Sequence, residues 1–266
     1  MLSTSHFSRG NMAVSWLNYP VLKQHESGNT FYADVINHYA KRERFDSKLT
    51  EAHEVSHFIH ADIRNAQGGR VNAFYVGNNQ AAVVKEPAIR KRIVAGYIPR
   101  SLQGFRYKTY VTGQTEWDDR ALYLWDEWSA YVNGGETGVD FVEKNLYKEQ
   151  WTDGVYGLLE FTVYGSAVAM ATKDLDTATF NDPQFLGFLE FQALRSERIY
   201  LRGSIMKQFK FDQQDNFLKN LRTSSDASAL RDFLKTYCQG AFLDRPTPTP
   251  TPTDTVTKKD FDVVGD

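Results

Sequence analysis

Residues 50–60 read TEAHEVSHFIH and contain the pattern H-E-x-x-H at His53, Glu54 and His57. On an α-helix, residues four positions apart lie one turn apart on the same face. Two imidazoles placed in this way can bind one Zn²⁺ ion, with Zn–N distances of about 2 Å. The pattern therefore predicts a metal-binding helix. The alternative is an amphipathic helix with surface histidines and an unrelated glutamate.

Glu54 is the residue of this pattern with a chemical role of its own. It follows His53 directly and should point toward the ligand position that the two histidines leave open. A carboxylate there can take a proton from a zinc-bound water and pass it to a leaving group. We therefore expect Glu54 to be the catalytic base of a hydrolase.

The neighbouring residues predict where the helix begins and ends. Asp46 or Ser47 is suited to cap its first turn. The helix should continue to about Asn65, because residues 67–69 are Gln-Gly-Gly and should end it. Another helix is expected over residues 31–44, where apolar residues recur at helical spacing.

A small β-element and many helices are expected in the rest of the chain. Residues 70–76 and 80–85 are rich in β-forming residues and flank Gly-Asn-Asn, which predicts a hairpin. Helices are expected over residues 87–97, from Asp118 or Asp119 to Gly134-Gly135, and over most of 141–242. Breaks in the last region are expected near Gly154, Pro183, Gly203 and Ser224. The predicted class is α+β and strongly helix-dominated.

The third zinc ligand is not part of the pattern. A catalytic zinc ion usually has three protein ligands, and all six histidines lie at or before position 60. About 10 Å along the helix axis separate His53 from His60, at 1.5 Å per residue. This separation favours a packing or supporting role for His60 over a ligand role.

Glu127 is the better candidate for the third ligand. It is expected on a largely apolar helix, and a buried carboxylate needs a cation or a metal as partner. Pairing with an arginine and exposure to solvent remain alternatives. Asp126 could replace Glu127, but successive helical residues point about 100° apart, so only one can face the ion. The small Ala130 would let another helix approach closely.

This combination resembles the gluzincin metallopeptidases of the zincin group. In that family H-E-x-x-H supplies two histidine ligands and the base, and a glutamate on a later helix supplies the third ligand. The resemblance implies that His53, His57 and Glu127 bind Zn²⁺ and that Glu54 is the base. It covers residues 53–131 and depends on two short motifs.

The chain departs from the family at the positions that assist the reaction. Tyr131 stands four residues after Glu127, where the family often has an aspartate that orients a histidine. No histidine follows position 60, so a tyrosine or arginine must stabilise the oxyanion. Tyr75, Tyr110 and Tyr131 are candidates, and we assign this catalytic role to Tyr131. Each of the three is otherwise suited to the core.

The strand expected at residues 71–76 has two interpretations. Zincins commonly have an edge strand near the zinc, which binds an extended peptide by strand addition. Here the strand follows the zinc helix, whereas in family members with a similar Asn-Ala-Phe run it usually precedes that helix. An ordinary structural hairpin is the other interpretation.

Composition excludes several classes of protein. The chain has 266 residues, 41% of them hydrophobic, and a net charge of −2, so no strong field favours nucleic acid. The basic cluster Lys85, Arg90, Lys91 and Arg92 is expected to be the solvated side of a helix. No apolar run reaches the length of a membrane span, which is about 18 residues. Cys238 is the only cysteine, which excludes an intrachain disulfide, and its apolar neighbours favour burial.

The expected organisation has three parts. Residues 1–140 form a zincin-like metal-site region, 141–245 a helical region packed on it, and 246–266 a disordered tail rich in threonine and proline. Such tails are commoner in exported proteins, so a secreted or cell-surface location is expected, although residues 1–20 lack the apolar region of a signal peptide. A cytoplasmic location remains open.

The sequence thus predicts a zinc-dependent hydrolase, most specifically a metallopeptidase acting on a peptide or protein. In this reaction a zinc-bound water, activated by Glu54, would attack a peptide carbonyl. One alternative is a catalytically inactive zincin-like module that binds a protein or glycan. The other is a helical structural protein in which the H-E-x-x-H pattern is accidental.

Overall fold

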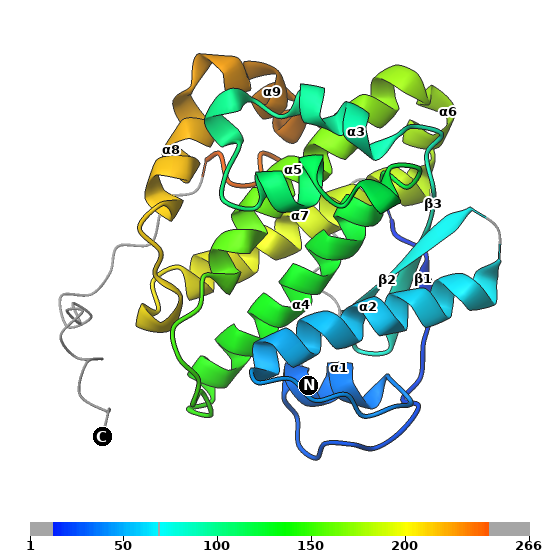
Figure 1. Ribbon diagram of the computed structural model, residues 1–266, viewed down its shortest axis with the longest axis vertical. Coiled ribbons are helices and arrows are strands. Elements are labelled where there is room, and N and C mark those ends of the chain that lie inside the picture. The colour runs from blue at the N-terminus through cyan, green and yellow to red at the C-terminus, as the bar shows by residue number, and fades with distance from the viewer. Residues whose placement is uncertain (1–12, 69, 245–266) are drawn as a thin grey trace.

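Four long helices form the framework of this computed structural model, which describes residues 13–68 and 70–244. They are α2 (Lys48–Gln67), α4 (Tyr123–Glu143), α5 (Gly154–Leu175) and α7 (Pro183–Gly203). The shorter α-helices are α1 (Phe31–Asn37), α3 (Lys91–Val94), α6 (Thr177–Phe180), α8 (Gln214–Thr223) and α9 (Ser228–Tyr237). The predicted α+β, helix-dominated class is confirmed (Figure 1).

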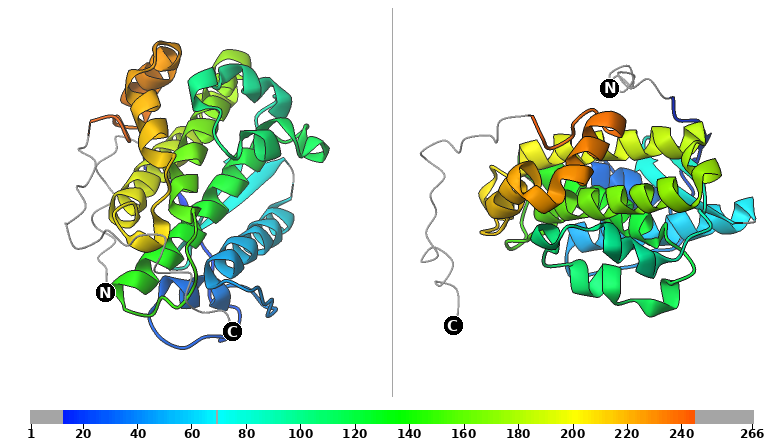
Figure 2. Two further views of the ribbon diagram at one scale, coloured as in Figure 1. Left: turned by 60° about the vertical axis from the view of Figure 1, so that its left-hand side comes forward. Right: turned by 90° about the horizontal axis from the view of Figure 1, so that it is seen from above.

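Helix α4 lies at the centre of the molecule and contacts α2, α5 and α7 (Figure 1). Its Trp125, Trp128 and Val132 side chains are fully buried. Helices α8 and α9 lie away from α2 and the sheet, on the other side of α5 (Figures 1 and 2). The central helix therefore has neighbours on several sides, which explains why its sequence is apolar around most of its circumference.

The sheet is small and antiparallel, with the strand order β1-β3-β2. Strands β2 (Val71–Gly77) and β3 (Gln80–Lys85) form the predicted hairpin, and Asn78 and Asn79 have the positive φ angles that its turn requires. Strand β1 (Trp16–Asn18) pairs with β3 and was not predicted, since a run of three residues has too little periodicity to be recognised.

The ends of the first helices differ in part from the prediction. Ser47 is the N-cap of α2, because its hydroxyl accepts from the N–H groups of Leu49 and Thr50 at 3.2 and 3.3 Å. Helix α1 ends at Asn37 and not at residue 44. The chain turns there because the buried His38 side chain bonds Asn79 in the β2–β3 turn at 2.7 Å.

The predicted limits of α4 were wrong at both ends. The helix begins at Tyr123, and it continues through Gly134 and Gly135 to Glu143. A Cβ atom on Gly134 would lie 3.0 Å from a backbone oxygen of α2, and one on Gly135 would lie 3.3 Å from a leucine of α5. These glycines therefore allow two helices to approach α4 closely and do not end it. The predicted cap Asp118 accepts instead from the N–H of Arg92 at 2.9 Å.

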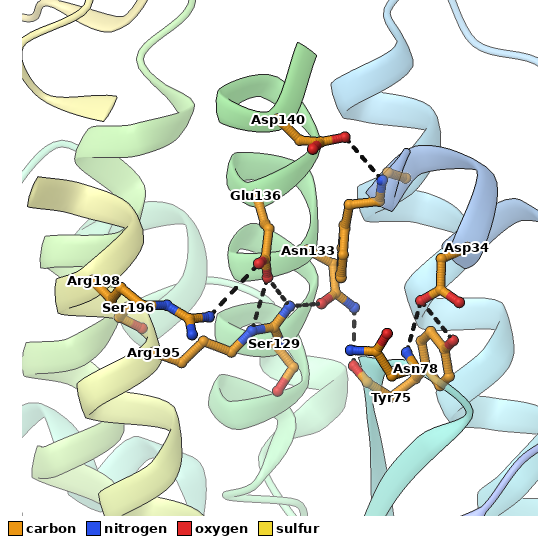
Figure 3. A network of polar contacts seen from close by, with 12 residues as sticks. Asp34, Tyr75, Asn78, Ser129, Asn133, Glu136, Asp140, Arg195, Ser196 and Arg198 are labelled. Atoms are coloured by element: carbon orange, nitrogen blue, oxygen red, sulfur yellow. Dashed lines mark hydrogen bonds and ion pairs between the residues drawn. The ribbon is translucent and has the colours of Figure 1, made fainter. Parts of the chain in front are cut away.

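A buried polar network fixes α4 against three neighbouring elements (Figure 3). The Asn133 amide donates to Ser56 of α2 at 2.8 Å and to the carbonyl of Tyr75 in β2 at 3.0 Å. Its oxygen accepts from Arg195 of α7 at 2.9 Å, and Arg195 also pairs with Glu136. Buried hydrogen-bond networks of this kind favour one arrangement of the packed elements.

Lys91 does not lie on a solvated face, which corrects the interpretation of the basic cluster. Its side chain is buried and donates to three backbone carbonyl oxygens, those of Tyr110, Val111 and Gly113. These lie at the end of the π-helical turn η4 (Tyr107–Thr112), where carbonyl groups lack helical partners. Arg90 and Arg92 are exposed, as predicted.

Other expectations concern the chain as a whole. Cys238 is buried, as predicted, and burial raises the pKa of its thiol.

Helix α4 crosses the predicted boundary between the first two regions at position 140. One hydrophobic cluster contains residues from both sides of this boundary, such as Trp125 and Val163. The tail at 246–266 lies outside the described residues. Among the described helices, none has the length and apolar character needed to cross a membrane.

Glu86 takes the place of the predicted cap at the start of α4. Its carboxylate accepts from the N–H of Leu122, the N-cap residue, at 3.1 Å, and from the side chain of Asn72. Only 4% of Glu86 is exposed. Burial raises the pKa of this carboxyl group to about 7, although its hydrogen bonds oppose the shift.

Substituting Glu86→Gln should therefore change how stability depends on pH. Because the folded pKa exceeds the unfolded one, the folded state binds more protons, and the contribution of Glu86 falls as pH rises toward 7. The free energy of unfolding of Glu86→Gln, minus that of the wild type, should rise by about 2 kcal/mol from pH 5 to pH 8. Urea unfolding at both pH values measures this difference.

Glu143→Gln provides the control, because the pKa of Glu143 is lowered by its exposed ion pair with Arg202. Its difference from the wild type should stay constant between pH 5 and pH 8, since Glu143 is ionised throughout. A flat difference for Glu86→Gln as well would show that Glu86 is ionised in the folded protein at pH 5.

Candidate metal centre

Helix α2 presents His53 and His57 toward α4. The two histidines lie on successive turns, and their Nε2 atoms are 3.1 Å apart. Their side chains are 15% and 20% exposed, so the pair is neither sealed in the core nor free in solvent. The predicted helix thus brings both imidazoles to one point on its surface.

Glu127 of α4 points at the same place. Its Oε2 atom lies 3.6 Å from Nε2 of His53 and 3.5 Å from Nε2 of His57. Glu127 is 7% exposed, and this buried oxygen has no hydrogen-bond partner. A buried carboxylate oxygen without a hydrogen bond is costly, and here its charged neighbours are the two imidazoles; a cation between the three groups would compensate it.

The three atoms have the spacing of ligands on one zinc ion. Two ligands of a tetrahedral zinc ion lie about 3.3 Å apart, given Zn–N and Zn–O distances near 2 Å. The observed separations of 3.1, 3.5 and 3.6 Å lie close to that value. The point in the plane of the three atoms that is equidistant from them lies about 2.0 Å from each, so these separations are compatible with one Zn²⁺ ion.

A second group of potential ligands adjoins the first and shares His57. Asp126 lies 2.8 Å from Nδ1 of His57 and 2.5 Å from Nδ1 of His60. These are hydrogen-bond lengths, and they are shorter than the separation of about 3.3 Å between two ligands of a tetrahedral zinc ion. Asp126 and His60 therefore lie outside the candidate ligand set and support it through hydrogen bonds. The candidate ligands are His53, His57 and Glu127.

The carboxylates act on the two histidines differently. Burial and the neighbouring His57 lower the pKa of His53 well below its usual value. Burial opposes protonation of His57 too, but Asp126 and Glu127 outweigh it and raise the pKa of His57. Burial would raise the pKa of Asp126, yet His57 and His60 hold it well below its usual range. Asp126 is therefore an ionised hydrogen-bond acceptor.

Glu54 follows His53 on α2, and its charged neighbours are His57 and Glu127. Burial raises the pKa of the Glu54 carboxyl group, His57 lowers it, and the charge of Glu127 raises it further. A carboxyl group with a raised pKa exchanges protons closer to neutral pH. A raised pKa is one of the properties that a general base needs.

Tyr131 forms an aromatic wall next to the histidines. Its ring meets the His53 ring edge to face, with centroids 4.6 Å apart, and stacks on Phe161 at 4.6 Å. The guanidinium of Arg106 lies 4.8 Å from the centre of the Tyr131 ring. A Cβ atom on Gly157 of α5 would come within 2.7 Å of the same ring, so this glycine makes room for it.

Three polar residues around Tyr131 were missed or underrated in the sequence. The Tyr110 hydroxyl, on the turn η4, lies 3.0 Å from the Tyr131 hydroxyl. Arg106 is buried between Glu160 and Asp153, and Tyr123 bonds Glu127. Tyr123 stands four residues before Glu127, so helical spacing could have revealed it, whereas only packing could reveal Arg106.

Two expectations about β2 receive no support. The Tyr75 hydroxyl donates to Asp34 and lies 2.9 Å from Nδ1 of His38, in a different cluster from the histidines of α2. Tyr75 is therefore not an oxyanion donor in this arrangement. Residues Ala73–Val76 are buried, and Asn133 bonds the carbonyl of Tyr75, so this strand offers no open edge to an extended peptide.

Comparison with known proteins supplies no family for this fold or site: no family model, curated protein or solved structure matches the chain.

Substituting Glu127→Ala should remove a ligand and weaken zinc binding by more than about 100-fold, beyond the effect of losing an outer partner. Glu143→Ala, on the exposed part of the same helix, should leave zinc affinity unchanged. Competition with a chromophoric chelator, on protein first stripped of metal, measures both. Equal affinity in Glu127→Ala and the wild type would show that Glu127 is only a structural ion-pair partner.

Proposed function

We propose that this protein is a zinc-dependent hydrolase, and specifically a metallopeptidase of gluzincin type. The observation that carries the proposal is the buried Glu127 oxygen, which has no hydrogen-bond partner and lies at ligand spacing from His53 and His57. Glu54 stands beside them in an environment that raises its pKa. Preference for a peptide over another substrate follows from the resemblance of the two motifs to gluzincins.

His53, His57 and Glu127 would hold the ion. Bound Zn²⁺ supplies Lewis acidity, which lowers the pKa of a water molecule and polarises a carbonyl group. Glu127 contributes one negative charge to the donor set and the histidines none, so part of the ion's charge stays available for the reaction. The partial exposure of His53 and His57 leaves this side of the site accessible to a substrate.

Glu54 would move the protons. It would accept one proton from the attacking water and deliver it to the nitrogen of the departing amine, so that the carboxylate is regenerated at the end of the cycle. The charge of Glu127 favours the protonated form of Glu54, and His57 favours the ionised form. Opposing influences of this kind suit a group that must both accept and release a proton.

Tyr131 would donate a hydrogen bond to the developing oxyanion. Burial raises its pKa, although Arg106 and Tyr110 oppose the shift, so the hydroxyl keeps its proton. The neighbouring Tyr110 hydroxyl, whose pKa is also raised by burial, can accept from or donate to Tyr131. The two tyrosine hydroxyls would then stabilise the oxyanion, a role that a downstream histidine fills in many gluzincins.

Glu54→Gln should separate zinc binding from hydrolysis. The variant should keep about one zinc ion per chain, and cleavage of fluorescent casein or of a mixed peptide library should fall by about 100- to 10,000-fold. Asp62→Asn, a solvent-exposed carboxylate of the same helix, is the matched control and should retain full activity. Wild-type protein that binds zinc but cleaves nothing would favour the inactive binding module.

Tyr131→Phe should test the oxyanion donor. The ring keeps its packing on His53 and Phe161, so zinc affinity should not change. Loss of one preorganised donor should lower kcat by about 100-fold while KM changes little. Tyr147→Phe, which removes a hydroxyl bonded to the carbonyl of Gln150, is the control. Unchanged kcat in Tyr131→Phe would leave Tyr110 or Arg106 as the donor.

A further inference from the structure

Two successive carboxylates of α4 contact opposite sides of one imidazole. Glu127 faces Nε2 of His57 at 3.5 Å, while Asp126 bonds Nδ1 of the same ring at 2.8 Å. The separation arises because adjacent helical residues point about 100° apart. His57 is thus held between a candidate ligand and a residue that cannot reach the ion.

Asp126 determines which nitrogen of His57 is available. A carboxylate oxygen accepts hydrogen bonds, and the 2.8 Å contact with Asp126 makes Nδ1 of His57 the donor. The lone pair available for a metal is then on Nε2, which is the nitrogen beside His53 and Glu127. Outer partners of this kind orient ligand rings and raise their basicity.

His60 holds the other oxygen of the same carboxylate. Its Nδ1 lies 2.5 Å from Oδ1 of Asp126, and its ring is buried edge-on against Phe74, with centroids 5.9 Å apart. With both oxygens occupied, Asp126 cannot rotate toward the ion and compete with Glu127. His60 therefore supports the candidate metal site through Asp126, and its ring also meets that of His57 edge to face, with centroids 6.4 Å apart.

We propose that Asp126 is the positioning residue of His57 and that His60 locks Asp126 in place, so that zinc affinity is set in part by two residues that do not touch the ion. This inference depends on the proposed zinc site and deepens it. It also gives His60 a role without making it a ligand.

Asp126→Asn tests the proposal with little change of shape. The amide cannot accept from both rings, so zinc affinity of the metal-free protein should fall by about 10- to 100-fold. Asp140→Asn is the matched control: it lies on the same helix, 14 residues after Asp126, and accepts from the N–H of Phe31 at 3.0 Å (Figure 3). It should leave zinc affinity unchanged even where the melting temperature falls.

A double-mutant cycle tests whether His60 acts through Asp126. His60→Asn alone should weaken zinc binding, by less than Asp126→Asn does. In the double variant, His60→Asn should cause no further loss of zinc affinity beyond that of Asp126→Asn. The reason is that the effects of residues that act through one another are not additive. Independent, multiplying effects of the two substitutions would overturn the locking role of His60.

Nitrogen-15 spectra of the histidine rings provide a measurement that needs no variant. The metal-free and zinc-loaded wild type should both carry a proton on Nδ1 of His57 and of His60. A zinc-loaded protein with the proton on Nε2 of His57 would overturn the proposal even if Asp126→Asn failed to fold.

The two proposals can fail separately. Zinc binding that is lost in Glu127→Ala but unchanged in Asp126→Asn would overturn the positioning role and leave the metal site intact. A wild-type protein that binds no zinc would overturn both.

Discussion

The close approach of α2 and α4 is the constraint on which the candidate site depends. Gly134 permits it, because a Cβ atom there would lie 3.0 Å from the carbonyl oxygen of Leu49 and 3.4 Å from Cβ of His53. At this separation a glutamate side chain spans the gap between the helices and reaches both histidine rings. A larger residue would push α2 away at the turn that carries His53. The cost of a glycine within a helix is offset by the packing that it allows.

Rotation of α4 about its axis matters as much as its distance from α2. The Asn133 amide bonds α2, β2 and, through Arg195, α7, so the helix cannot turn without breaking buried hydrogen bonds. A rotation would exchange the directions of Asp126 and Glu127. The network therefore lies about two turns from the site and still decides which carboxylate faces the histidine Nε2 atoms. Such long-range support is typical of functional sites built on rigid helices.

The aromatic side of the site is assembled from a part of the chain that has little regular structure. Tyr110 lies on a π-helical turn whose last carbonyl groups are satisfied by the buried Lys91. Arg106, at the start of that turn, is held by Glu160 and lies over the Tyr131 ring. Turns of this kind occur frequently at functional sites, and buried charges are tolerated in them only when paired. The segment is irregular, yet its anchoring contacts are specific.

Local sequence determined the helix that carries His53, Glu54 and His57, its Ser47 cap, the β2–β3 hairpin and the helix-dominated class, because each depends on periodicity or on turn residues a few positions apart. It also singled out Glu127, because a carboxylate in an apolar helix needs a partner. Tertiary structure alone decided that α4 runs through Gly134, that Lys91 is buried, and that Asp126 and His60 bond each other. The physical reason is distance along the chain. These outcomes depend on contacts between residues about 20 to 85 positions apart, which leave no periodic trace in the sequence.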